Sequence, residues 1–383
     1  MLRRYALFLS VLLGTLWGCQ AQENITEVRD GVTYVINPRH GSHQDQATAP
    51  LRFELEQVFG AEEEPRQALL FGIASVVTDD QGTVYVLDIG DNRLVAFNPD
   101  GSVRWQTGRQ GQGPGEFQRP RGLAWDGDST LYTANQGGSR IDAFDTNGDF
   151  LYSHLLVEHD LYSVRLRGFL PPRTLVLSQT ASGHIGTEAI LLEMGDPWEK
   201  KTEFMLDQSE GLRVLGNTSI GLDLNITDGE LAFGNHHLYR LHFFDTLGTL
   251  KRVVSRDLPH LVRPGFWESM DGNSRSISTY SNVSAPLRLA SGHWLSSAFW
   301  ATNVPDPDEH LRLSRNGNAP DVENAYTLDL FDEEGKLLYS LTGEGSTPDI
   351  GQLAHVDAAG KLYTIVFDPY PQVRRYRIVL FLQ

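Results

Sequence analysis

The sequence feature that most constrains the fold is an internal repeat with an offset of 47 residues. Residues 76–103 align without a gap with residues 123–150. Identical residues at equivalent positions include Asp79 and Asp126, Tyr85 and Tyr132, Arg93 and Arg140, Phe97 and Phe144, and Gly101 and Gly148. Repeats of this length are typical of folds built from several copies of one small supersecondary unit.

Each copy reads as three or four short strands separated by polar turns. In the first copy, 83–87 and 93–97 are predicted as the second and third strands, and 103–107 as the fourth. The segment 98–101, Asn-Pro-Asp-Gly, is predicted as the hairpin turn before the fourth strand. Such turns use Gly, Asn and Asp because these residues tolerate positive φ angles.

Weaker copies continue to the end of the chain, at residues 166–206, 225–257, 286–341 and 354–381. The last copy ends after its third strand. Arg52–Phe59 alternates in the strand pattern and is predicted to supply the missing fourth strand, which would close the ring and remove its open edges. The sequence therefore predicts an all-β fold: a six-bladed β-propeller of four-stranded antiparallel blades, with the last blade closed by an N-terminal strand.

The first two copies resemble the NHL repeat, in residues 111–117, 120–126 and 144–148 above all. This resemblance covers roughly residues 60–157, and later copies keep only the strand rhythm and the Asp/Gly turn. The whole chain looks like the six-bladed propeller lipoproteins of environmental and gut bacteria. The repeated motif residues are expected to hold turns, strands and blades together and not to contact a ligand; they are Asp79, Asp126, Asp88, Asn135, Arg93 and Arg140.

The first residues are typical of an export signal. Arg3 and Arg4 precede an apolar run that ends near Leu16, and this run is too short to span a bilayer as a permanent helix. Leu16-Trp-Gly-Cys19 resembles the lipobox of bacterial lipoproteins, which implies lipidation of Cys19 and, with Gln20 after it, the outer membrane as the location. The alternative is ordinary secretion with an incidental Cys19.

The expected organisation is therefore a lipoprotein signal peptide (1–18), an anchor and linker (19–50) and the propeller (51–383). The net charge of −17 makes nucleic acid an unexpected partner, because an acidic surface repels phosphate. Cys19 is the single cysteine, so no disulfide can form within the chain.

Two long departures from the repeat are the expected ligand-binding region, residues 256–282 and residues 300–324. In a four-stranded blade the loops after strands two and four emerge on one face, and these two belong to adjacent blades, so they should meet. The predicted ligand-binding residues on this face are Trp267, Trp300, Arg263, Tyr280, His310, Tyr370, His236 and His237. The alternative is that the aromatic residues only pin the loops in place.

The function that this pattern favours is a ligand- or protein-binding module of the cell envelope. Carbohydrate, peptide and protein are the expected ligand classes, and the sequence assigns no cofactor. No catalytic motif is present, and the acidic segment 306–310 is interpreted as a solvated loop and not as a calcium site. A metal-dependent propeller hydrolase or lyase with its site in the central channel is the alternative, and a structural part of an envelope assembly is a third hypothesis.

Overall fold

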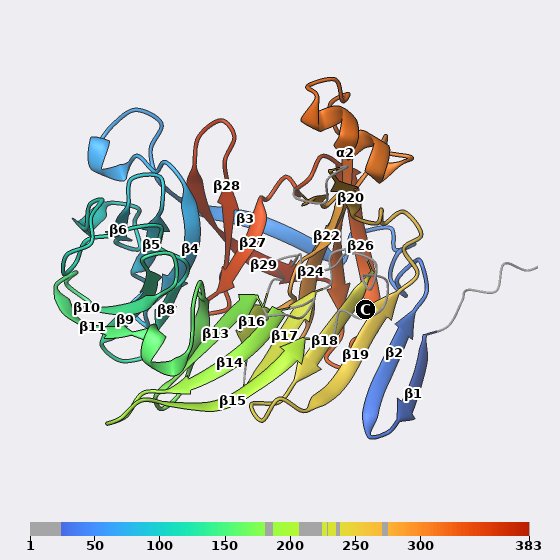
Figure 1. Cartoon of the computed structure of the whole chain (residues 1–383). Coiled ribbons are helices and arrows are strands. Elements are labelled where there is room, and N and C mark those ends of the chain that lie inside the picture. The colour runs from blue at the N-terminus through green and yellow to red at the C-terminus, as the bar shows by residue number, and fades with distance from the viewer. Residues whose placement is uncertain are drawn as a thin grey trace, which may run out of the picture.

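Short alternating strands, separated by Asp/Gly turns, form six radial sheets in a ring (Figure 1). The computed structural model describes residues 24–382, except 181–186, 207–223, 228, 235–237 and 270–274. Each sheet is antiparallel between consecutive strands, and the first strand of each blade lies innermost. The predicted six-bladed all-β propeller is confirmed.

The first three blades follow the repeat closely. Blade 1 contains β4 (Ile73–Thr78), β5 (Val84–Asp88), β6 (Arg93–Phe97) and β7 (Val103–Thr107). Blade 2 contains β8 (Leu123–Trp125), β9 (Thr130–Asn135), β10 (Arg140–Asp145) and β11 (Phe150–Leu155), followed by the 3-10 helix η2 (Leu156–His159). Blade 3 contains β12 (Arg165–Leu170), β13 (Thr174–Thr180), β14 (Thr187–Glu193) and β15 (Glu199–Leu206).

The other three blades carry the additions. Blade 4 contains β16 (Leu224–Thr227), β17 (Glu230–Gly234), β18 (Arg240–Phe244) and β19 (Leu250–Arg256). Blade 5 contains β22 (Ser281–Val283) and β23 (Leu287–Arg288), which share the innermost position, then β24 (Trp294–Ala301), β25 (Asn324–Phe331) and β26 (Leu337–Glu344). Blade 6 contains β27 (Gln352–Val356), β28 (Leu362–Val366), β29 (Gln372–Leu380) and β3 (Leu51–Phe59).

The turn after the first strand is held by the predicted aspartates. Asp79 Oδ1 accepts hydrogen bonds from the amides of Gln81 and Thr83, and Gly82 adopts a φ of +78°. Asp126 Oδ1 accepts from three amides in the same turn of blade 2. The structural role predicted for these aspartates is confirmed.

The predicted Arg, Asp and Asn motif residues form buried polar contacts between strands and loops. Arg93 pairs with Asp88, which also accepts hydrogen bonds from the amides of residues 71 and 72, and Arg140 pairs with Asp142. The side-chain oxygen of Asn135 accepts from the amide of residue 118. Pairing is required here because an isolated charge in such a buried place would be strongly destabilising.

The ring is closed by the pairing of an N-terminal strand with the last blade. β3 lies antiparallel to β29, with Leu51 opposite Leu380 and Phe59 opposite Val373. This pairing joins residues more than 300 positions apart and leaves β29 without an open edge. The prediction that Arg52–Phe59 supplies the fourth strand is confirmed.

A second N-terminal element lies within the range 19–50, which the sequence analysis treats as anchor and linker. β1 (Ile25–Arg29) and β2 (Val32–Asn37) form a hairpin, and β2 pairs in parallel with β19, so blade 4 becomes part of a six-stranded sheet (Figure 1). The side chain of Asn37 donates to the Gly335 carbonyl (2.9 Å) and accepts from the Leu337 amide (2.7 Å). The hairpin therefore ties blade 4 to blade 5.

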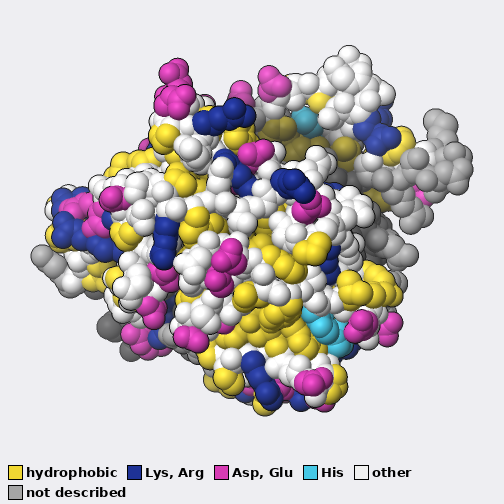
Figure 2. All heavy atoms as spheres, turned by 90° about the vertical axis from the view of Figure 1, so that its left-hand side faces the viewer, with side chains coloured by type: hydrophobic (Ala, Val, Ile, Leu, Met, Phe, Trp, Pro, Cys, Tyr) yellow, Lys and Arg dark blue, Asp and Glu magenta, His cyan; other side chains and the backbone are white. Residues whose placement is uncertain are grey.

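The outer side of blades 1 and 2 carries an apolar area. Leu151, Leu155 and Val157, on β11 and η2, are exposed. Figure 2 shows hydrophobic side chains gathered low on this side, with charged side chains of both signs around them. β11 is the edge strand of blade 2, and charged neighbours disfavour edge-to-edge pairing with another sheet.

Phe59 and His355 both contribute to the contact between blades 6 and 1. Phe59 is fully buried, with its ring 6.0 Å from that of Phe97 in blade 1 and 6.2 Å from that of Tyr363 in blade 6. His355 Nε2 and Thr78 Oγ1 share a hydrogen bond of 2.9 Å between the innermost strands of these blades. Burial lowers the pKa of His355 to about 4.

We expect Phe59→Ala to lower the free energy of unfolding by about 3–5 kcal/mol, because it leaves a cavity between two blades. The matched control is Leu55→Ala on the same strand, where the side chain is 53% exposed and the change should stay within about 0.5 kcal/mol. Urea unfolding of both variants measures the difference. Equal effects would show that β3 does not couple blades 6 and 1.

We expect His355 to make the protein less stable as the pH falls from about 6.5 to about 4. In this window the unfolded chain binds a proton that the folded chain does not, so stability is lost as the pH falls. His355→Gln removes this contribution, and its unfolding free energy should have a slope smaller by up to about 1.4 kcal/mol per pH unit. Parallel pH profiles of the two proteins would contradict a lowered pKa.

Candidate functional site

The two insertions predicted to meet do fold against each other. β20 (Gly265–Glu268) and β21 (Arg275–Ser278) form a hairpin after blade 4, and α2 (Pro307–Arg315) lies between β24 and β25. Helix α2 packs on this hairpin (Figure 1). We call the described residues of 257–280 and 302–323 the insertion platform.

The sequence interpretation of residues 306–310 as a solvated loop is wrong, because they begin helix α2. The Asp306 side chain caps the helix by accepting hydrogen bonds from the amides of Asp308 and Glu309. Pro307 follows at the first helical position, where its missing N–H costs nothing, and arginines lie in the last turn. These are local helix signals, but the helix is too short to show a sustained apolar period.

An ion pair joins the two insertions. Arg263 Nη1 and Nη2 donate to Asp308 Oδ1 and Oδ2 at 2.8 and 2.7 Å, and the amide of Phe266 donates to the same carboxylate at 2.7 Å. The hydrogen bonds from Arg263 lower the pKa of Asp308, and those to Asp308 raise the pKa of Arg263. Three donors on one carboxylate fix the helix against the hairpin.

Aromatic side chains form the rest of this contact. The Arg315 guanidinium lies 3.9 Å from the ring centre of Trp267. The Tyr280 hydroxyl and His310 Nδ1 share a hydrogen bond of 3.1 Å, and His310 Nε2 lies 3.0 Å from the Pro320 carbonyl oxygen. Tyr280 itself is buried.

Some of the predicted ligand-binding residues lie together in the insertion platform, and others lie elsewhere. Arg263, Trp267, Tyr280 and His310 are brought together, and their contacts hold the insertions to each other. Trp300 lies in strand β24, half-buried, with its ring 5.8 Å from that of His260.

The other predicted residues do not join this group. Tyr370 is half-buried in the β28–β29 loop of blade 6, and its carbonyl oxygen accepts from Gln372. His236, His237 and Cys19 lie outside the described residues.

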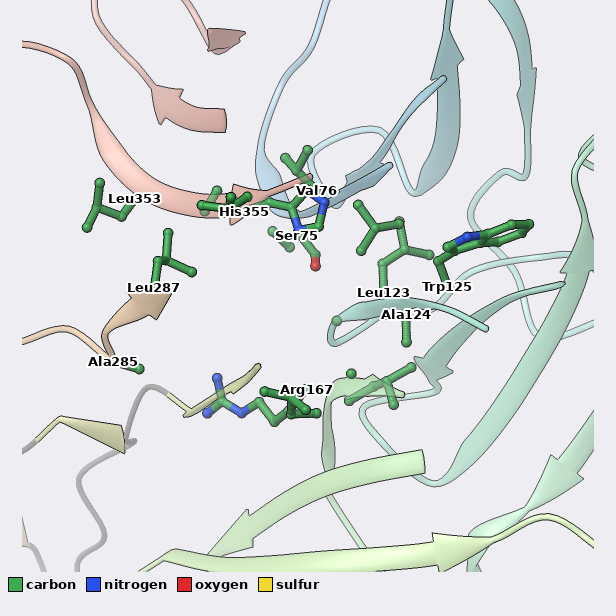
Figure 3. A pocket seen from close by; sticks show the side chains of 18 of the residues that line it. Ser75, Val76, Leu123, Ala124, Trp125, Arg167, Ala285, Leu287, Leu353 and His355 are labelled. Carbon is green, nitrogen blue, oxygen red and sulfur yellow. The ribbon is translucent and has the colours of Figure 1, made fainter. Parts of the chain in front are cut away.

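A second candidate site is the cavity at the centre of the ring. Its volume is about 480 Å³, within the range of small-molecule sites, and the innermost strands of all six blades contribute to its wall. Figure 3 shows Arg167 on one side, with Ser75 and His355 opposite and Leu287 and Leu353 beside them.

The cavity wall combines small apolar residues with cations. Arg165, Arg167 and Arg288 contribute to it, and among the described lining residues His355 is the sole histidine, aspartate or glutamate. The described part of the chain contains no cluster of three His, Cys, Asp or Glu side chains that could hold a metal ion. The metal-dependent alternative gains no support from these residues.

Sequence reasoning did not single out the cavity residues. The available signal was the alternation Arg165-Leu166-Arg167 in the first strand of a repeat copy. Arg165 and Arg167 line the cavity from β12, the first strand of blade 3.

Comparison with known proteins extends the resemblance of the repeats, although no family model matches the chain. Human NHL repeat-containing protein 3 is 31% identical over 99 residues, and the mouse protein of the same name is 34% identical over 83 residues. These matches cover 24% and 20% of this chain. The chain spans 28% and 24% of the length of these two relatives.

Solved structures are similar over nearly the whole chain. A member of the DUF4221 family from Bacteroides vulgatus has a TM-score of 0.55 at 10% identity, and the match covers 87% of this chain and 99% of that one. A protein from Bacteroides fragilis that is described as exported has a TM-score of 0.54 at 11% identity, with 90% and 99% covered. At these identities the likeness shows the fold alone. The chain is a six-bladed β-propeller with distant homology to NHL repeat-containing proteins.

Proposed function

We propose that this chain is an exported binding module that captures a ligand or partner with the loops on one face of its propeller. The observation that carries the proposal is the insertion platform: two long insertions from adjacent blades form one ordered body on that face. Function in repeat folds commonly lies where one repeat departs from the others. Carbohydrate, peptide and protein remain the ligand classes to test.

The platform is suited to binding because it is held in one arrangement before any ligand arrives. The Arg263–Asp308 pair and the Tyr280–His310 contact join its two halves. A surface that is already ordered loses less conformational entropy on binding than a mobile loop would. Trp267, stacked on Arg315, offers an amphipathic surface of the kind enriched in binding sites.

The platform also adjoins the central cavity. Residue Tyr280 ends the first insertion, β22 begins at Ser281, and Ser284 and Ala285 line the cavity. The amide of Val262 donates to the Ser281 side chain at 2.6 Å, which ties the base of the platform to the innermost strand.

We also propose that the mature protein is held at the outer membrane through a lipid on Cys19. The support is the signal-peptide pattern and the lipobox-like Leu16-Trp-Gly-Cys19. A structural neighbour is described as exported. Within the described residues, no helix has the length and hydropathy to cross a membrane.

We expect Asp308→Ala to weaken ligand capture by about tenfold or more, because it removes the acceptor that joins the two insertions. The experiment compares capture by wild type and variant on glycan and peptide arrays. Limited proteolysis should also show faster cleavage within 257–280, while global unfolding changes little.

The matched control is Asp321→Ala, which removes a carboxylate from the same insertion without removing the contact to Arg263. This variant should capture the same ligands as wild type. Equal capture by Asp308→Ala and wild type would rule out the platform as the binding surface.

We expect Cys19→Ser to move the protein from the membrane fraction to the soluble exported fraction in bacterial cells. The mass of the mature wild-type N-terminus should exceed that of the peptide by the mass of its acyl chains. A wild-type protein that is soluble and unacylated after export would favour ordinary secretion.

A further inference from the structure

Two arginines, Arg121 and Arg165, lie where blade 2 meets blade 3, and Arg165 lines the central cavity. Arg121 precedes β8 and Arg165 begins β12, which are the innermost strands of these blades. The amide of Leu166 donates to the Arg121 carbonyl at 2.9 Å. Gly122 permits this approach: its φ is +93°, and a Cβ there would lie 2.0 Å from the Leu166 carbonyl oxygen.

Arg119 adds a third positive charge nearby. Burial, and after it the charges of Arg165 and Arg119, lower the pKa of Arg121. Arg121 Nη1 donates to the Ser163 carbonyl oxygen at 3.3 Å, which holds this side chain beside the start of β12. Arg121 and Arg165 therefore lie together, and with Arg119, whose charge also acts on Arg121, we call them the arginine cluster.

The cluster has no carboxylate partner among the described residues. The motif arginines of blades 1 and 2, and Arg256 of blade 4, each pair with an aspartate. Arg119, Arg121 and Arg165 take part in no salt bridge with any residue that the structure describes.

The cluster opens onto the cavity. Arg165 and Arg167 both line it, and the Nε of Arg167 donates to Ser178 Oγ at 2.7 Å, which orients that side chain. Guanidinium groups bind carboxylate, sulfate and phosphate oxygens through charge-assisted hydrogen bonds. The cavity of about 480 Å³ has room for the remainder of a small molecule.

We propose that the arginine cluster binds the oxyanion group of a small molecule, a carboxylate, sulfate or phosphate, at the mouth of the central cavity. The anion replaces the repulsion among three cations by attraction to each of them. This site belongs to blades 2 and 3 and does not depend on the insertion platform of blades 4 and 5.

The test uses acetate, sulfate and inorganic phosphate as separate probes, in a buffer of low ionic strength. Isothermal titration and the shift in melting temperature measure binding to wild type, Arg121→Gln, Arg165→Gln and the double variant. We expect one probe or more to bind saturably, each single variant to bind about tenfold or more weakly, and the double variant to lose binding. The strongest probe identifies the kind of oxyanion.

The matched control is Arg173→Gln, on the same blade, where the arginine pairs with Glu193. It makes the same charge change and should bind the probes as wild type does. Asp308→Ala should also retain anion binding, so failure of the platform and failure of this site are distinguishable.

A second measurement distinguishes an anion-binding role of the arginine cluster from a purely structural role. Without added anion, Arg165→Gln should melt at or above the temperature of wild type, because it removes a repulsive neighbour of Arg121. Added anion should then raise the melting temperature of wild type more than that of the variant. The proposal is overturned if no probe binds saturably, or if Arg165→Gln and Arg173→Gln bind equally.

Discussion

The pairing of β3 with β29 is the constraint on which the remaining architecture depends. It supplies the fourth strand of blade 6 and places Phe59 between blades 6 and 1, so the N-terminal and C-terminal parts of the chain together close the ring. Because the ring is closed, the innermost strands of all six blades surround one cavity. The hairpin β1–β2 is a second N-terminal segment that joins blades, since it ties blade 4 to blade 5 through Asn37.

Arginine has two different roles in this fold. In the buried positions of the repeat it pairs with aspartate, as Arg93 does with Asp88, because a lone charge there would be costly. At the cavity mouth Arg121 and Arg165 lie near solvent, where an unpaired charge is tolerated and remains available to an anion. The scaffold arginines are buried, whereas Arg121 is half-buried and Arg165 is exposed.

The two candidate sites differ in how they arise from the repeat. The insertion platform is added chain, and its residues were visible in the sequence as a departure from the repeat. The contacts among these residues could not be predicted from the sequence. In the structure, Tyr280 and His310 join the two insertions to each other. The cavity is formed by the innermost strands of the repeat itself, and Arg165 and Arg167 line it from blade 3.

The sequence by itself determined the fold class, the number of blades, the turn aspartates and the strand that closes the ring. These follow from local alternation and from turn residues, which act over a few neighbours and repeat at a fixed spacing. Only the tertiary structure decided that α2 packs on the β20–β21 hairpin, and that Arg121 lies beside Arg165. Such contacts join residues of different blades, so their distances depend on how the blades pack, as at Gly122, and no local pattern records that packing.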